Sequence, residues 1–300
     1  MIVALPNCAN LPDWEVDDVP FHRALETIGL SWERPIWDDP SVNWASYDGV
    51  VIRTTWDYQE KEPAFVAWAS HVASVSKLFN PPEVITWNTQ KTYLRDLESA
   101  GARLTPTQWL DTGTNPNIAT LMAESGWSKG FLKPVVGATA RETLRFDSSP
   151  DGLAAAQSHI DRLIPHEALM LQPYLNSVEE AGELSALYFG DAYSHGVRKV
   201  PVPGDYRVQD DFGASDEPYT FTEAEEIELE QIRRALKTVL QEKLGVSEPL
   251  LYARIDVLRD GDGGLYLNEL ELVEPSLFFR HDTDSPLRLA QAVASKLSDC

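Results

Sequence analysis

The chain has 300 residues, a length that predicts about two domains and a core large enough to need no disulfides. Its 47 acidic residues outnumber the 25 lysines and arginines, which gives a net charge of −22. This charge excludes nucleic acid as a bulk partner and argues against an anionic membrane surface, because both are bound through clustered basic side chains. No apolar run approaches the roughly 20 residues of a membrane-spanning helix.

The ends of the chain indicate a cytoplasmic protein. Residues 1–6 lack the basic segment of a signal peptide and are typical of a strand. Cys8 and Cys300 stand at opposite ends, and their number and spacing fit neither a metal cluster nor a disulfide framework. We therefore expect a reduced protein of the cytoplasm, and the sequence leaves room for a homo-oligomer.

Strand-like and helix-like patterns alternate along the chain, which favours an α/β fold. Near the N-terminus, residues 2–5 and 49–53 are short runs rich in Val and Ile, the pattern of buried parallel strands. Apolar residues at helical spacing predict helices over 20–28 and 63–75. Together these elements predict a small βαβ unit over residues 1–85.

The rest of the chain is expected to mix strands and helices in the same way. Asn88 is expected to cap a helix that ends at Gly101. Thr222 and Glu225 have the spacing of a capping box, which predicts the start of a long helix that ends at Gly245. Further strands are expected at 130–136, 169–175, 186–189, 250–258 and 264–272. A last helix is expected at 286–297.

Three carboxylates near the C-terminus form the first candidate site. Residues two apart on a strand share a face, so Glu269 and Glu271 point the same way while Leu270 points to the other side. Like charges on one face repel unless a cation lies between them, and Asp256 on the neighbouring strand adds a third oxygen donor. Such a set suits Mg²⁺. On spacing alone, a solvated edge of an acidic protein explains these residues equally well.

Isolated cations form the second candidate site. Lys133 ends a strand ahead of the small-residue turn 137–140, where a lysine can bind phosphate together with backbone amides. A surface lysine is an equally good explanation. Lys199 and Arg207 precede an acidic stretch that contains no Lys or Arg before Arg233, so they could clamp a phosphoryl group or form surface ion pairs. The sequence contains neither a P-loop nor a Rossmann fingerprint.

The order of these motifs resembles that of the ATP-grasp superfamily, in its glutathione-synthetase-like branch. The matching blocks are Asn88-x-x-Lys91, Lys133-Pro134-x-x-Gly137, Gln172-Pro173-Tyr174-Leu175, Gly182-Glu183, Arg198-Lys199-Val200-Pro201-x-x-Gly204-Asp205-x-Arg207, and Asp256 followed by Glu269-x-Glu271-x-x-x-Pro275. The resemblance covers nearly the whole chain. It implies an α/β (α+β) ATP-grasp fold with an N-terminal βαβ pre-ATP-grasp domain over 1–85. A small lobe over 86–165 and a C-terminal lobe with the metal site over 166–300 would then clasp ATP.

The resemblance also implies ATP and Mg²⁺ as cofactors and assigns roles to the matching residues. By role, these are Lys91 and Lys133 on the ATP phosphates; Gln172, Tyr174 and Leu175 around adenine; Glu183 at the ribose or adenine; Lys199 and Arg207 at the transferring phosphoryl group and the acyl phosphate; and Asp256, Glu269 and Glu271 on Mg²⁺.

Three departures from the family pattern bear on these roles. The phosphate loop has one glycine, Gly137, followed by Ala138-Thr139-Ala140 where the family is often glycine-rich. Ser185 stands where glutathione synthetases carry an arginine, which argues against glutathione as the product. Glu271 stands where many relatives carry Asn, and it keeps an oxygen ligand.

Three sequence segments resemble one particular family within the superfamily. Val51-Ile52-Arg53-Thr54-Thr55-Trp56-Asp57-Tyr58, Trp37-Asp38-Asp39-Pro40 and Val273-Glu274-Pro275-Ser276-Leu277-Phe278 resemble the cyclo-ligases of cycloserine biosynthesis. Those enzymes close O-ureido-serine to the isoxazolidinone ring with ATP. A small amino-acid-like substrate is therefore implied, with no nucleic acid and no membrane as partner.

The expected substrate contacts come from the same segments. Arg53 ends a strand at the crest of the first domain, where α/β sheets place ligand contacts. We assign Arg53 to a substrate carboxylate and Asp57 to a substrate amine, with an Arg53–Asp57 structural pair as the alternative. Tyr58, Glu274 and Ser276 are further candidates. Cys8 and His195 are expected to pack or to face solvent rather than to act as nucleophile or base.

The predicted reaction is ATP-dependent activation of a carboxylate as an acyl phosphate, captured by a nitrogen nucleophile. In a cyclo-ligase that nitrogen belongs to the same molecule. The alternatives are an intermolecular carboxylate–amine ligase that makes a dipeptide or a modified peptide, a nucleotide-binding module without catalysis, and a kinase that forms a stable phosphate ester. The loops 136–141 and 200–218 are predicted lids that protect the acyl phosphate from water.

Overall fold

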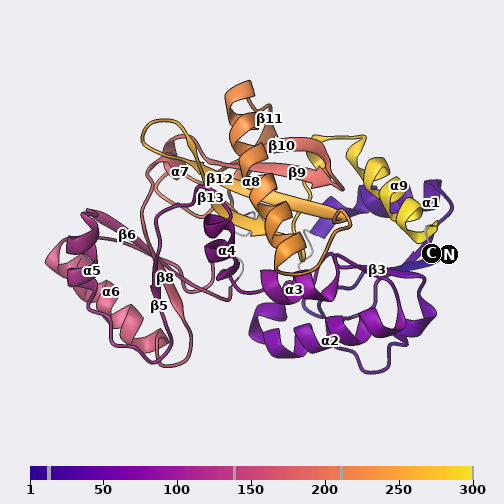
Figure 1. Ribbon diagram of the computed structural model, residues 1–300, viewed down its shortest axis with the longest axis horizontal. Helices are drawn as coiled ribbons and strands as arrows, with labels where there is room; N and C mark the ends of the chain where they lie inside the picture. Colours follow the sequence, from indigo (N-terminus) through magenta and orange to yellow (C-terminus); the bar gives the residue numbers. More distant parts are fainter. Residues whose placement is uncertain (12–14, 138–139, 210–211, 299–300) are drawn as a thin grey trace.

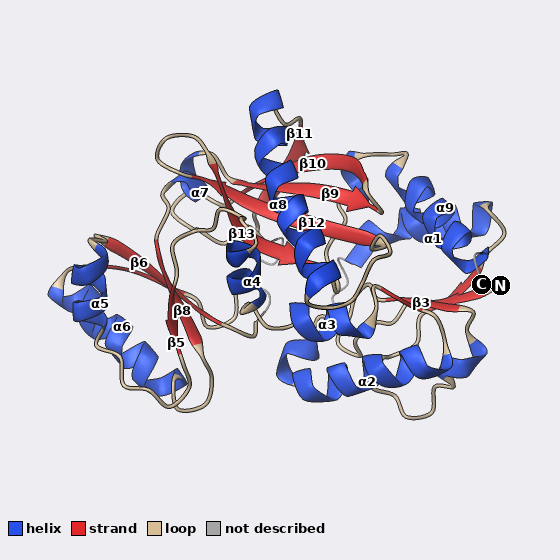
Figure 2. Ribbon diagram, viewed as in Figure 1, coloured by secondary structure: helices blue, strands red, loops and turns tan. Residues whose placement is uncertain are grey.

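Three β-sheets organise the protein, whose computed structural model describes residues 1–11, 15–137, 140–209 and 212–298 (Figure 1). The N-terminal sheet is parallel, and the other two are antiparallel. Helices lie against all three sheets (Figure 2). Among the described residues, no helix combines the length and the apolar character needed to cross a bilayer.

The first sheet has the strand order β2-β1-β3-β4 and is parallel throughout. Its strands are β1 (Ile2–Ala4), β2 (Ser31–Glu33), β3 (Gly49–Val51) and β4 (Leu78–Phe79). Successive residues bury on opposite faces, so Val51 packs with α1 (Val19–Thr27) and Val50 with α2 (Glu62–Val75). The C-terminal helix α9 (Ser285–Ser298) joins α1 on the first of these faces, beside the N-terminus (Figure 1).

The second sheet has the order β5-β8-β6-β7 and is covered by two helices. Its elements are β5 (Gln108–Leu110), α5 (Ile118–Ser125), β6 (Lys129–Pro134), β7 (Leu144–Asp147), α6 (Pro150–Leu163) and β8 (Leu169–Pro173). Because β8 pairs with both β5 and β6, we propose that the small lobe extends through β8 rather than ending at residue 165. The boundary at residue 85 stays a prediction, and helix α9 from the end of the chain packs with the N-terminal unit.

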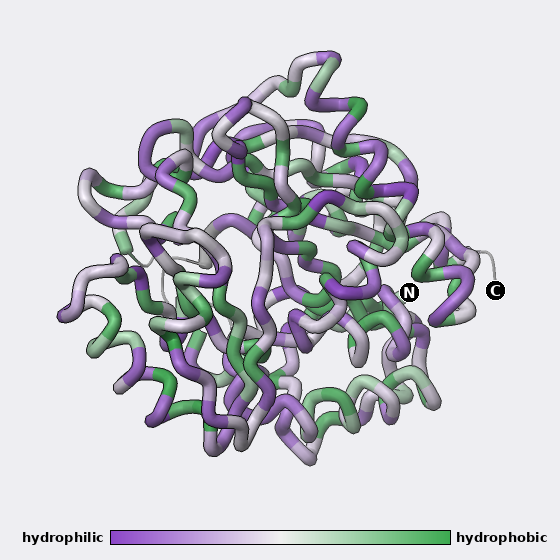
Figure 3. The backbone as a smooth tube through the Cα atoms, turned by 60° about the vertical axis from the view of Figure 1, so that its left-hand side comes forward, coloured by the Kyte–Doolittle hydropathy of each residue, from purple (hydrophilic) through white to green (hydrophobic). Residues whose placement is uncertain are grey.

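The third sheet has the order β11-β10-β9-β12-β13 and forms the centre of the molecule. Its strands are β9 (Glu183–Phe189), β10 (Ala192–Val200), β11 (Ser215–Tyr219), β12 (Tyr252–Arg259) and β13 (Leu265–Glu271), with α7 (Ser177–Glu180) ahead of them. Helix α8 (Glu223–Glu242) packs across this sheet and begins at the predicted capping box of Thr222 and Glu225. Figure 3 shows hydrophobic and hydrophilic residues alternating along the helices, as helices with one buried face require.

One predicted helix start is wrong. Asn88 ends α3 (Pro82–Asn88), and the next helix, α4 (Tyr93–Ser99), begins five residues later. The buried Asn88 side chain instead binds β13, since its Nδ2 donates to the Leu270 carbonyl at 3.0 Å and its Oδ1 accepts from the Leu272 amide at 2.8 Å. An asparagine that binds a distant strand has the same local sequence as one that caps a helix, so the pattern could not separate the two.

Candidate active site

A cavity of about 380 Å³ lies where the first unit and the two antiparallel sheets meet. Every residue singled out above as a site residue lines this central cavity, with the exception of Arg53. The strand ends of the first unit contribute the segment 56–60, the second sheet contributes Lys133, and the third sheet contributes the carboxylates. The cavity thus unites residues from nearly the whole length of the chain, from Cys8 to Phe278.

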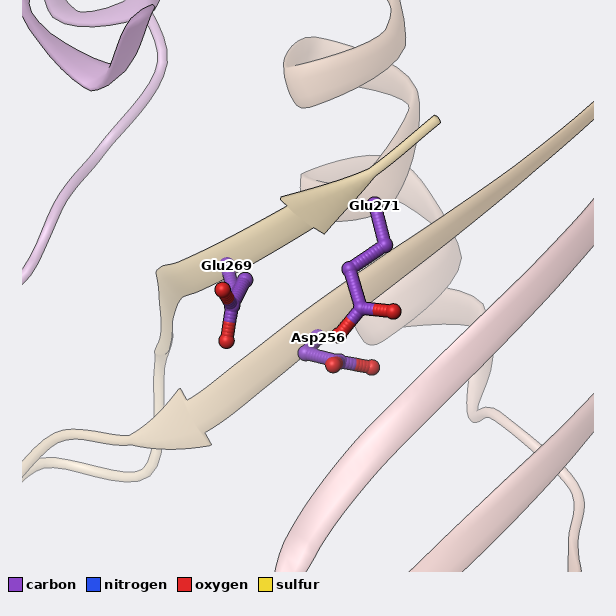
Figure 4. A group of neighbouring side chains, drawn as sticks. All are labelled: Asp256, Glu269 and Glu271. Carbon is purple, nitrogen blue, oxygen red and sulfur yellow. The ribbon is translucent and has the colours of Figure 1, made fainter. Parts of the chain in front are cut away.

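The three predicted metal ligands lie together on two neighbouring strands (Figure 4). Asp256 of β12 stands opposite Glu269 of β13, and one carboxylate oxygen from each of Asp256, Glu269 and Glu271 lies within 4.8 Å of the others. Leu270 is buried on the opposite face, as the alternation predicts. The ladder shifts register after Asp256, so Asn268 falls in an irregularity of β13 that turns its side chain toward the same cavity.

Of the two lysines expected at the phosphates, Lys91 contacts one of these carboxylates directly, whereas Lys133 contacts the neighbouring Asn268. Lys91 lies 2.7 Å from Glu269 and donates to the Gly137 carbonyl at 2.7 Å. Lys133 donates to Asn268 at 3.3 Å, and the Asn268 amide donates to Glu183 at 2.7 Å. Positive and negative side chains therefore form one continuous network along one wall of the cavity.

Burial and charge set the protonation of this network. Burial lowers the pKa of Lys133 to about 8. Burial acts the same way on Lys199, but the neighbouring charges of Asp256 and Glu183 outweigh it and raise the pKa of Lys199. For Asp256, burial would raise the pKa, yet the Arg254 and Lys199 charges lower it to about 2. The cavity thus keeps Lys199 and Asp256 charged.

Arg254 lines the cavity although the sequence pattern did not single it out as a site residue. It is buried on β12, where its guanidinium binds Asp256 and Glu271 and donates to the Ser276 carbonyl at 3.1 Å. Burial raises the pKa of Glu271 to about 7 in spite of this contact. The sequence could have indicated that Arg254 lies beside Asp256, because the two residues are two positions apart on a strand and so share a face. Asn268 gave no such signal, since an irregular register cannot be seen in the sequence.

Ser185 explains one departure from the glutathione synthetases. On β9 it stands opposite Asp256 of β12, and its hydroxyl donates to the Asp256 carboxylate at 2.6 Å. The position that carries an arginine in those enzymes therefore orients a carboxylate here, and the side chain is fully buried.

The residues that are expected to surround adenine lie at the link between the second and third sheets. Gln172 is buried and donates to Thr107 at 2.8 Å, while Leu175 and Tyr174 follow β8 in the cavity wall. The Tyr174 hydroxyl donates to Glu179 at 2.5 Å, and burial raises the pKa of Tyr174 to about 12.

Arg207 lines the cavity but is held by its own loop. Its guanidinium donates to Asp205 at 2.6 Å and lies 3.9 Å from the centre of the Phe212 ring. The same bond keeps the pKa of Asp205 well below its usual range. Part of each predicted lid, Ala138 with Thr139 and Asp210 with Asp211, lies outside the described residues, as does Cys300.

The substrate contact proposed for Arg53 is not supported by its position. Arg53 is 2% exposed, lies outside the cavity wall, and forms a two-pronged ion pair with Asp18 at 3.1 and 2.7 Å. Burial would lower the pKa of Arg53, but Asp18 outweighs it and raises the pKa. The alternative pair with Asp57 does not form either, because the short helix of residues 15–18 places Asp18 there instead.

The other expected substrate residues line the cavity. Asp57 accepts from the Trp37 indole at 2.7 Å and from Lys61 at 3.4 Å. Tyr58 is buried and stacks on Phe65, and Ser276 has its hydroxyl 3.3 Å from Asp17. Glu274 joins them as a buried carboxylate.

Cys8 and His195 are both buried, in keeping with a packing role. Burial raises the pKa of the Cys8 thiol and lowers the pKa of His195. The His195 ring lies 3.0 Å from the Leu277 carbonyl and outside the cavity wall. Cys8, in contrast, lines the cavity, and the charge of Asp57 adds to burial in raising the pKa of its thiol.

This arrangement, a hinged antiparallel lobe facing carboxylate-bearing strands across a cavity, is that of the ATP-grasp ligases. The chain is similar to D-alanine–D-alanine ligase from Bacillus anthracis in complex with ATP, with a TM-score of 0.70 at 11% identity over 100% of this chain and 98% of that one. It is also similar to the RimK-domain ATP-grasp protein from Sphaerobacter thermophilus, with a TM-score of 0.66 at 15% identity over 98% and 100% of the two chains. These similarities confirm the predicted fold.

The similarity to one member of this class is higher. The chain matches the crystal structure of D-cycloserine synthetase DcsG with a TM-score of 0.88 at 28% identity, over 99% of this chain and 100% of that one. It is 30% identical over 290 residues to the cycloserine biosynthesis protein DcsG of Streptomyces lavendulae, covering 94% of each. The family model of the DcsG N-terminal domain matches residues 3–80. The chain therefore belongs to the DcsG family of ATP-grasp ligases, which confirms the family and the class of enzyme predicted from the sequence.

Proposed function

We propose that the chain uses ATP to activate the carboxylate of a small amino-acid-like substrate, which a nitrogen of the same molecule then captures. O-ureido-serine is the proposed substrate, and an isoxazolidinone of the cycloserine type is the proposed product. The observation that carries this proposal is the similarity to the cycloserine biosynthesis protein DcsG along 94% of the chain. The network of lysines and carboxylates in the central cavity supports it.

The carboxylates fit a hard divalent cation. Asp256, Glu269 and Glu271 offer oxygen donors within 4.8 Å of one another from two rigid strands, which is the donor chemistry that Mg²⁺ prefers. When bound, such an ion neutralises phosphate charge and so favours attack on the γ-phosphorus. We propose these three residues as the metal ligands.

The remaining polar residues would bind and orient the nucleotide. We propose Lys91 and Lys133 at the phosphates and Gln172, Tyr174, Leu175 and Glu183 at the adenosine end. Lys91 and Lys133 both belong to the small lobe, whereas Glu183 comes from the third sheet. ATP held between them would close the two lobes around the reacting phosphate.

Lys199, Arg207 and the buried Arg254 would serve the transfer itself. The substrate carboxylate attacks the γ-phosphorus, the bond to the ADP oxygen breaks, and an acyl phosphate forms. The ureido nitrogen bound to the side-chain oxygen then attacks the acyl carbon and loses its proton, while phosphate leaves with the electron pair of the broken C–O bond. The carbamoyl group on that nitrogen is then removed by water as CO₂ and NH₃, which gives the free isoxazolidinone. Fixed positive groups favour the first two steps because negative charge develops on the departing oxygens in a cavity that excludes water.

The decisive experiment measures ADP release with a panel of amino acids, including both enantiomers of O-ureido-serine, and determines the product mass. ADP and phosphate formed from O-ureido-serine alone, with a cyclised product, support the proposal. A requirement for a second amino acid indicates an intermolecular ligase. A stable phosphate ester, with no hydroxamate when hydroxylamine is added, indicates a kinase. Absence of ADP with every carboxylate indicates a binding module.

The proposed partner is thus a small molecule, and we place the reaction in the cytoplasm, where ATP is available. A homo-oligomer is compatible with this proposal.

A further inference from the structure

Glu274 differs from the other carboxylates of the central cavity. Its side chain is 8% exposed and lines the cavity, and within the described part of the chain its carboxylate accepts no hydrogen bond and forms no ion pair. The contact made by this residue is through its backbone, because the Trp56 indole lies 3.3 Å from the Glu274 carbonyl. A mostly buried carboxylate without a protein partner is unfavourable in its charged form, so its surroundings favour either protonation or a cationic ligand.

The other carboxylates proposed as site residues have partners. Asp57 binds Trp37 and Lys61, Glu183 binds Lys199, Glu269 binds Lys91, and Asp256 and Glu271 bind Arg254. Burial and the charge of Glu271 raise the pKa of Glu274 to about 8, although the charges of Lys91 and Arg254 act in the opposite direction, so without a ligand the protonated form is favoured at neutral pH. Within the described residues, Glu274 is therefore the buried acidic group of the cavity whose carboxylate has no protein partner, whereas Glu60, which also lines the cavity, is exposed.

The backbone around Glu274 is fixed on both sides. The Tyr252 hydroxyl donates to the Val273 carbonyl at 2.7 Å, and Arg254 donates to the Ser276 carbonyl at 3.1 Å. Both donors stand on β12, which also carries Asp256. The backbone that carries Glu274 is consequently held in a defined place three residues beyond the proposed metal ligand Glu271. A group so fixed can select a ligand without first becoming ordered.

We propose that Glu274 binds the α-ammonium group of the substrate and thereby restricts the central cavity to amino acids, an inference that rests on the proposed function. An ammonium group provides the positive charge and the donors that this carboxylate lacks. On an α-amino acid the ammonium lies one carbon from the carboxylate, which matches a site beside the proposed phosphoryl-transfer residues. Asp57 is less suited, because its two oxygens already accept from Trp37 and Lys61.

The test compares O-ureido-serine with its analogue that lacks the α-amino group, using the wild type, Glu274→Gln and Glu274→Asp. In the wild type, kcat/KM is expected to be much higher for the aminated substrate. In Glu274→Gln this preference should fall by at least roughly 30-fold, the low end for removing one partner of a buried charge pair, while the KM for ATP stays within about threefold. Glu274→Asp keeps the charge and should retain most of the preference.

The control is Glu226→Gln on the exposed face of α8, which makes the same chemical change outside the cavity. An unchanged preference in Glu274→Gln, or its loss in Asp57→Asn instead, overturns the assignment. If the wild type forms ADP from another amino acid but not from O-ureido-serine, the proposed substrate is wrong. The same comparison is then made with that amino acid and its des-amino analogue, so the role of Glu274 is decided separately.

Discussion

Lys199 and Asp256 form a buried ion pair that reaches across a strand. Lys199 stands on β10 and Asp256 on β12, with β9 between them, yet Nζ lies 3.2 Å from the carboxylate. Glu183 continues the network beyond Lys199, and Arg254 continues it beyond Asp256. Charges of opposite sign therefore alternate across the floor of the cavity, and each side chain depends on its neighbours for compensation.

Lys199→Met should lower stability as well as activity. The change leaves Glu183 and Asp256 without the ammonium that both contact, and breaking a buried pair from one side destabilises by about 3–5 kcal/mol. Urea unfolding gives the free-energy difference. The control is Lys243→Met, which removes the more exposed contact with Asp96 and should change the free energy of unfolding by less than about 1 kcal/mol. Equal effects of the two substitutions would contradict the compensating role of Lys199.

Glu269→Gln tests the metal ligands. The substitution keeps the side-chain volume but removes one of three carboxylate charges, so the Mg²⁺ concentration needed for half-maximal ADP formation should rise at least about tenfold. Turnover at limiting Mg²⁺ should fall accordingly. The Glu226→Gln variant again provides the matched change outside the cavity. Undiminished turnover with an unaltered Mg²⁺ dependence would remove Glu269 from the metal site.

The sequence predicted these carboxylates well because their arrangement follows from local geometry. The two-residue period of a strand places Glu269 and Glu271 on one face and buries Leu270 on the other, whatever surrounds the strand. The same holds for the capping box at Thr222 and Glu225, where donor and acceptor are three residues apart. Features set by neighbouring residues could therefore be predicted without knowledge of the tertiary structure.

Features set by distant residues could not be predicted in this way. Asn88 binds the backbone of β13 about 180 residues away, and Asn268 enters the cavity only through an irregular strand register. The position of Arg53 at a strand end suggested a ligand contact, but it did not reveal that Asp18 lies beside it. In each case the packing of whole helices and strands determines the partner, and a short sequence pattern carries no information about that packing.

Lys133 should make ATP binding depend on pH. Burial lowers its pKa to about 8 from an ordinary value of 10.5, so the charge that would hold phosphate is lost as the pH rises through about 8. The KM for ATP should therefore increase severalfold between pH 7 and pH 9. In Lys133→Arg the guanidinium stays charged throughout this range, and the increase should disappear. An identical rise in both proteins would assign the pH dependence to another group.

The Arg53–Asp18 ion pair allows a test of whether Arg53 stabilises the fold or contacts the substrate. Arg53→Met leaves the Asp18 carboxylate, which is 4% exposed, without its partner and should destabilise the fold by about 3–5 kcal/mol. The double variant Asp18→Leu with Arg53→Met removes both charges and should recover most of the lost stability, since an apolar pair can replace a buried ion pair. Thermal and urea unfolding of the three proteins measure the coupling. Recovery of stability in the double variant indicates a structural role for Arg53. If Arg53 contacts the substrate instead, Arg53→Met should raise the KM for the substrate at unchanged stability, and the double variant should show no recovery.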